Sequence, residues 1–108
     1  MLNLALLVAC KPAEVSSASS GSTDNAIHRG ADIAAVNCGR CHNIGTDGSS
    51  PHPIAPSFGA IVQRYPLDYL RSTLEGGLDA GHLGMPAIEL EDRVIEDLKT
   101  YMRSLSGP

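Results

Sequence analysis

The feature that most constrains this chain is the pentapeptide at residues 38–42, Cys-Gly-Arg-Cys-His. Two thiols three residues apart on one turn of chain can each add to a vinyl group of the same porphyrin, while the adjacent imidazole of His42 reaches the iron. The spacing of Cys38, Cys41 and His42 thus allows two thioether bonds and one bond to iron to form with the same haem. It therefore predicts covalent attachment of one haem c through Cys38 and Cys41, with His42 as an iron ligand.

Three other interpretations of the two cysteines compete with haem attachment. A zinc site would draw on the four histidines of the chain, but no second closely spaced ligand pair accompanies the first. A redox-active Cys-x-x-Cys pair is typical of a strand–helix–strand unit, and no segment here alternates apolar and polar residues long enough to predict a strand. A structural disulfide leaves His42 unexplained. We therefore favour haem.

Size and charge limit the other functions of the chain. Its 108 residues have room for one small domain. A net charge of −4 leaves no basic stripe for phosphates, so we expect no nucleic-acid partner. The chain has only three tyrosines, one phenylalanine and no tryptophan. A small domain this poor in large core side chains usually needs a cofactor, a metal or a disulfide, and haem would complete its core.

The N-terminal segment predicts export. Residues 1–9 form an apolar run that is too short to span a bilayer. This run is typical of the hydrophobic core of an export signal peptide. The sequence Leu-Val-Ala-Cys at residues 7–10 resembles a bacterial lipobox, which predicts a lipidated Cys10 and a periplasmic, membrane-anchored protein. No basic residues precede the run. Two alternatives to the lipoprotein interpretation therefore stay open: a plain signal peptide, or a true start of the protein further upstream. Residues 10–25 would carry the lipid and a flexible, Ser-rich tether, with the folded domain at residues 26–108.

Four helical segments are predicted in that domain. The first covers Ala26 to Val36, with Asp24 or Asn25 as its N-cap and small residues on its inward face. A short second helix follows Ser57 and carries Phe58, Ile61 and Val62.

The third and fourth helices have clearer boundaries. Pro66 suits the first position of the third helix, which ends at the glycines at 76 and 77. The last helix has an apolar stripe, with acidic residues early and basic residues late. Its stripe consists of Leu90, Val94, Leu98, Tyr101 and Leu105.

A second iron ligand is expected from the loop before the last helix. Met85 lies between Gly84 and Pro86, where a flexible thioether can be presented rather than packed. His82 in the same loop is the rival, whereas Met102 on the last helix suits a core or surface position. His28 and His52 read as solvated surface residues. Ligation by both His42 and Met85 would leave iron no open position, which favours electron transfer over chemistry on oxygen or peroxide.

Residues from about Ala26 to Leu105 resemble the class I c-type cytochromes. The shared features are the C-x-x-C-H motif at the end of a first helix, a proline-containing loop, a Met-Pro pair and a terminal helix with an aromatic residue. The resemblance implies an all-α fold of about four helices packed around one covalently bound haem.

The same resemblance implies two contacts. Gly30 would allow the first helix to cross the last one closely near Tyr101, and the carbonyl of Pro56 would accept a hydrogen bond from the second ring nitrogen of His42. One departure is Ala34, where members of the family often carry an aromatic residue, so the crossing would be looser or filled from Ile33, Leu98 or Tyr101.

The function predicted from these features is that of a monomeric electron carrier, not an enzyme. Its single haem c would cycle between Fe(II) and Fe(III) and exchange electrons with redox proteins. Two alternatives remain open: a permanent haem subunit of a periplasmic oxidoreductase, and a haem-based gas sensor or peroxidase. Residues 43–63 contain only Asp47 as a charged residue, and residues 76–87 only Asp79, so we expect a weakly charged docking surface beside the haem.

Overall fold

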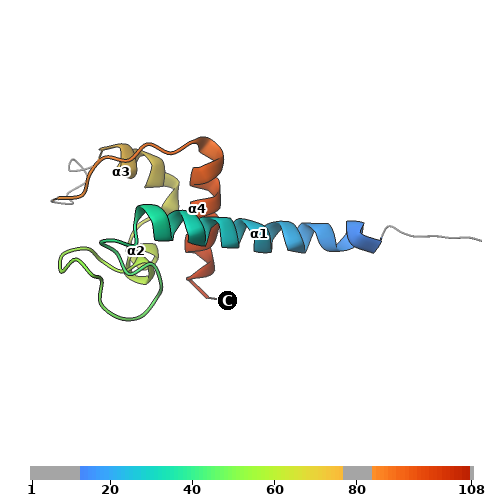
Figure 1. Cartoon of the computed structure of the whole chain (residues 1–108), viewed down its shortest axis with the longest axis horizontal. Coiled ribbons are helices and arrows are strands. Elements are labelled where there is room, and N and C mark those ends of the chain that lie inside the picture. The colour runs from blue at the N-terminus through green and yellow to red at the C-terminus, as the bar shows by residue number, and fades with distance from the viewer. Residues whose placement is uncertain (1–12, 77–83, 108) are drawn as a thin grey trace, which may run out of the picture.

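The computed structural model describes residues 13–76 and 84–107, with side-chain surroundings from residue 21 onward. Its elements follow the order α1 (Ala13–Asn37), α2 (Phe58–Arg64), the 3₁₀ turn η1 (Leu67–Tyr69), α3 (Leu70–Gly76) and α4 (Asp92–Ser104) (Figure 1). The described residues contain no strand. The all-α prediction is therefore confirmed. No helix among them is both long and apolar enough to cross a membrane.

Helix α1 begins earlier than the sequence predicted. It starts at Ala13 rather than near Ala26, so Asp24 and Asn25 lie inside the helix and do not cap it. Residues 13–25 contain no proline and only one glycine, and extending an existing helix costs far less than nucleating one. The N-terminal half of α1 projects beyond the other helices (Figure 1), while its C-terminal half packs against α4.

The crossing of α1 and α4 depends on Gly30. A Cβ added at this residue would lie 2.1 Å from the carbonyl oxygen of Asp97 and 2.6 Å from Cβ of Tyr101. Only glycine allows the two backbones to approach so closely. Beside it, Ala34 is completely buried, and Ile33, Leu98 and Tyr101 belong to the same apolar cluster. These residues occupy the crossing without the aromatic residue that the family often has at position 34.

The segment from residue 43 to residue 57 loops out and returns to its own start. Near its end, the backbone N–H groups of Phe58 and Gly59 donate to the carbonyls of Asn43 and Gly45, at 2.9 and 3.0 Å. Ser57 then caps α2, because its side chain accepts a hydrogen bond from the N–H of Ala60 at 3.2 Å. The loop thereby places Pro56 beside the residues that follow α1.

The apolar face of helix α4 is wider than the stripe that the sequence predicted. Ile95, Leu98 and Met102 are the buried residues, and of these only Leu98 belongs to the predicted stripe. Tyr101 faces α1 at Gly30, while Leu98 and Met102 border the cavity described below. A helix that packs on another helix and also borders a cavity needs a wider apolar surface than a single stripe provides.

Candidate functional site

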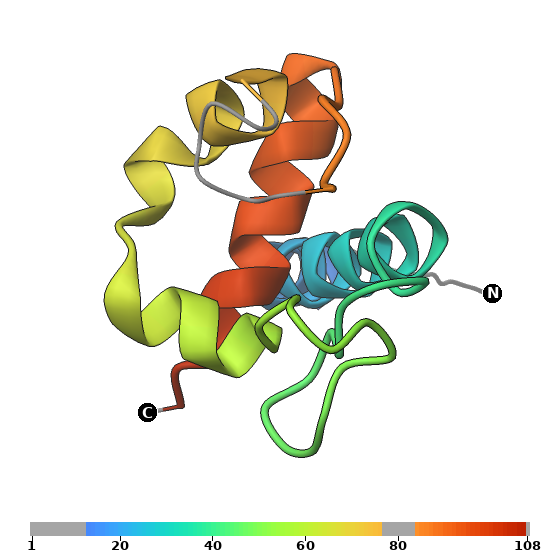
Figure 2. The same cartoon turned by 90° about the vertical axis from the view of Figure 1, so that its left-hand side faces the viewer.

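A cavity of about 910 Å³ opens between the helices. The C-terminal end of α1, the loop after it, α2, η1, α3 and residues 84–88 surround the opening, and α4 lies behind (Figure 2). Its volume falls within the range of about 300–1,000 Å³ that is usual for cofactor and ligand pockets. The inner wall is apolar and includes Phe58, Leu74, Leu98 and Met102.

Cys38, Cys41 and His42 all line this cavity. The turn that follows α1 gathers them, because the N–H groups of Cys41 and His42 both donate to the carbonyl of Cys38, at 3.1 and 2.8 Å. Both cysteines are free thiols. Burial raises the pKa of the Cys38 thiol to about 11, so it stays protonated at neutral pH.

The imidazole of His42 is buried and held on two sides. Its Nδ1 lies 2.7 Å from the carbonyl oxygen of Pro56, and a carbonyl can only accept, so Nδ1 carries the proton. The ring of Phe58 packs at a tilt with its centroid 5.8 Å away. With Nδ1 protonated, the lone pair of Nε2 is free to bind a metal. The hydrogen bond that the resemblance implied is therefore present.

Tyr101 lies on α4 and contacts Phe58 and the loop that follows His42. Its ring lies 6.5 Å from that of Phe58, and its hydroxyl donates to the carbonyl of Ile44 at 2.6 Å. Burial raises the pKa of the phenol, so the hydroxyl stays a donor at neutral pH. Through these contacts α4 holds the first residues of the loop after His42.

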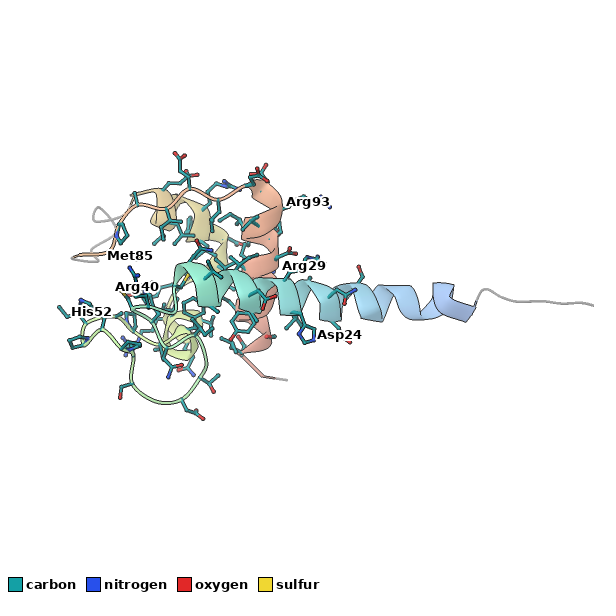
Figure 3. The ribbon with its side chains drawn as sticks, in the orientation of Figure 1. Asp24, Arg29, Arg40, His52, Met85 and Arg93 are labelled. Carbon is teal, nitrogen blue, oxygen red and sulfur yellow. The ribbon has the colours of Figure 1, made fainter. Side chains whose placement is uncertain are left out.

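The predicted second ligand also reaches the cavity. Met85 is half-buried and lines it, and lies on the opposite side of the mouth from His52 (Figure 3). Met102 lines the cavity as well and is almost completely buried. His82 lies outside the described residues, as do Cys10 and the signal segment. The selection of Met85 as an iron ligand stays a prediction.

The donor set and the space fit a covalently attached haem. One wall supplies two neighbouring thiols and an imidazole with a free Nε2, and the remaining walls are largely apolar. Within the described residues, no group of three or more His, Cys, Asp or Glu side chains could hold a metal ion. This part of the chain therefore offers no ligand set for zinc.

Comparison with protein families identifies the chain. Residues 27–106 match the model of the cytochrome c family, and the chain belongs to that family. Membership implies covalently bound haem c and haem-based electron transfer. Comparison with curated proteins and with solved structures gave no match.

Sequence reasoning missed two features, one at the cavity and one at the crossing of α1 and α4. Met102 borders the cavity, and the spacing 95, 98, 102 on α4 was a second helical stripe that could have revealed it. Arg29 forms a two-pronged ion pair with Asp97, at 2.8 and 3.0 Å, which ties α1 to α4. No local pattern signals a pair that is 68 residues apart.

Proposed function

We propose that this protein is a single-haem electron carrier in which His42 and Met85 bind the iron from opposite sides. When bound, the haem supplies reversible one-electron exchange between Fe(II) and Fe(III). The observation that carries the proposal is the cavity wall itself: Cys38, Cys41 and His42 border one apolar space, and Pro56 fixes the imidazole with Nε2 free.

Each of these residues has a distinct part in the proposal. Cys38 and Cys41 would hold the haem through thioether bonds to its vinyl groups. The Pro56 carbonyl orients His42 and makes its imidazole a stronger donor to the metal. Met85 supplies a soft sulfur, which favours Fe(II) and raises the potential relative to a second imidazole. If His42 and Met85 both bind, the iron would have no open position for oxygen or peroxide.

We also propose where the protein works. Lipidation of Cys10 after export would anchor it to a bacterial membrane, on the periplasmic side, as a monomer. Its partners would be redox proteins of that compartment. Support comes from the sequence at residues 1–10 and from the family, since thioether attachment of haem c in bacteria takes place outside the cytoplasm.

The test is production of the full chain in a bacterium that attaches haem c during export. We expect one haem per chain, resistant to acid extraction, and a redox titration that follows a single one-electron curve. Replacement of Cys38 and Cys41 together by alanine should abolish covalent attachment, whereas Cys10→Ser should leave the spectrum unchanged and release the protein from membranes. A full chain that carries no covalent haem would contradict the proposal.

A further inference from the structure

The segment of residues 84–91 carries Met85 and runs beside α3 to the start of α4 (Figure 1). Met85, Ile88 and Leu90 are partly buried and pack against the apolar core. A backbone hydrogen bond fastens the segment to α3, because the N–H of Ile88 donates to the carbonyl of Leu74 at 2.8 Å. The position of Met85 therefore depends on how firmly this segment is held to α3.

The side chain of Arg71 adds a second tie between α3 and the same part of the chain. Its Nη1 donates to the carbonyl of Leu90 at 3.4 Å, and its Nη2 forms an ion pair with Asp92 in the first turn of α4. These partners follow Arg71 by 19 and 21 residues. A guanidinium carries its N–H groups in a fixed planar fork, so one arginine can serve two acceptors at once. Arg71 thereby fixes the end of the segment that carries Met85.

Arg71 makes these contacts outside the cavity. Leu70, Thr73 and Leu74 of α3 line the cavity, whereas Arg71 is not among the lining residues. A group that fills the cavity therefore does not compete for the guanidinium. Arg71 also pairs with Glu75 at 3.4 Å, but both of these residues lie on α3, so their pair fastens nothing to the segment. The tie to residues 90 and 92 can thus be separated by mutation from the pair within α3.

The tie made by Arg71 is modest in strength. The side chain of Asp92 is 91% exposed and that of Arg71 39% exposed, and water screens ion pairs at such positions. A contribution of this size does not decide whether the domain folds. Local opening of a segment costs far less than global unfolding, however, so a modest contact changes how often the opening occurs. Detachment of residues 84–91 from α3 is the local opening that would carry Met85 away from the cavity.

We propose that Arg71 is a positioning residue for Met85, because it holds residues 90–92 to α3 and so limits how often the Met85 sulfur gives up its place to another ligand. This inference rests on the proposed function, in which Met85 completes the iron site. Arg71 touches neither the sulfur nor the cavity, and it acts only through the segment that carries Met85. A small external base such as imidazole competes with Met85 for the same position and reports on its hold.

The test is the affinity of the oxidised, haem-loaded full chain for imidazole, followed by the loss of the far-red band that methionine ligation gives. Arg71→Gln should raise this affinity about two- to fivefold, the range expected when an exposed ion pair is lost. Arg71→Lys keeps the charge but not the fork, so it should recover part of the difference. Asp92→Asn should act in the same direction as Arg71→Gln. The double variant should go no further than Arg71→Gln alone, because the pair is then already absent.

Two matched controls separate positioning of Met85 from general stability. Glu75→Gln removes the pair within α3, and Arg29→Gln removes the ion pair between α1 and α4. Both should leave the imidazole affinity nearly unchanged, although Arg29→Gln lowers the free energy of unfolding. An effect of either control equal to that of Arg71→Gln, or no effect of Arg71→Gln, would overturn the inference. Absence of the far-red band from the native protein would contradict the proposed function itself, and the inference with it.

Discussion

The carbonyl oxygen of Pro56 accepts a hydrogen bond from Nδ1 of His42 at 2.7 Å, across 14 residues of chain. The acceptor is a backbone atom, so its position depends on the path of the loop rather than on a side chain. Pro56 restricts that path through its fixed φ, and Ser57 directs the chain straight into α2. The orientation of the candidate iron ligand is thus determined by two local features of the loop.

Pro56→Ala should therefore separate the hydrogen bond from the rigidity of the loop. The carbonyl remains, so the reduction potential and the visible spectrum should stay unchanged. The free energy of unfolding should fall by about 0.4–1 kcal/mol, because alanine gives the unfolded chain more conformations. Chemical denaturation and a redox titration of the same sample measure both quantities. A large change in potential at unchanged stability would contradict this prediction, because it would show that alanine does not keep the carbonyl in its place beside the imidazole.

Gly30→Ala should weaken the packing of α1 on α4. The new methyl group would meet the backbone of Asp97 and Cβ of Tyr101, neither of which can move without shifting α4. We expect a loss of about 1–3 kcal/mol in the free energy of unfolding. Gly21→Ala is the control, because Gly21 lies on the same helix with open space around it. That change should be neutral or mildly stabilising, and a similar loss from both variants would refute the account of the crossing.

The ion pair of Arg29 and Asp97 should make stability depend on acid pH. The hydrogen bond from Arg29 lowers the pKa of Asp97 below its ordinary value of 3.8. The contribution of the pair to the free energy of unfolding is therefore complete at pH values above 3.8. It is lost as the pH falls through the lower pKa of the folded protein. Arg29→Gln should therefore reduce stability at pH 7, and the difference from the native protein should shrink at strongly acid pH. A difference that persists unchanged in acid would show that the charge pair is not its cause.

Loss of haem should unfold most of the domain. The cavity of about 910 Å³ lies next to a core with few buried large side chains, so an empty site would leave much apolar surface without partners. The double change Cys38→Ala and Cys41→Ala should lose most of its helical circular dichroism when haem is withheld. Cys10→Ser, loaded with haem, should keep the native signal. A cooperative thermal transition in the haem-free double variant would contradict this prediction.

The sequence was informative where the cause is local. The start of α2 after Ser57, the end of α3 at Gly76 and the turn through Cys38 and His42 all arise from neighbouring residues. It was uninformative where distant segments decide the outcome. The start of α1 depends on helix extension from its packed half. The width of the apolar face of α4 depends on the cavity beside it. The Arg29–Asp97 pair exists only after α1 and α4 cross.

The presence of two methionines at the cavity permits a direct test of the iron site. Met85 and Met102 both line it, but Met102 is almost completely buried on α4, while Met85 stands half-buried in the segment at the mouth. The proposed electron carrier depends on the sulfur of Met85 filling the last position on the iron. Met102→Leu, similar in volume, should leave that bond intact.

The most direct measurement is the far-red absorption of the oxidised haem protein, where iron bound by methionine sulfur gives a weak charge-transfer band. We predict the band in the native protein and in Met102→Leu, and its disappearance in Met85→Ala. Persistence of the band in Met85→Ala, or its absence from the native protein, would contradict the assignment of Met85 and with it the closed iron site on which the proposed electron-carrier function rests.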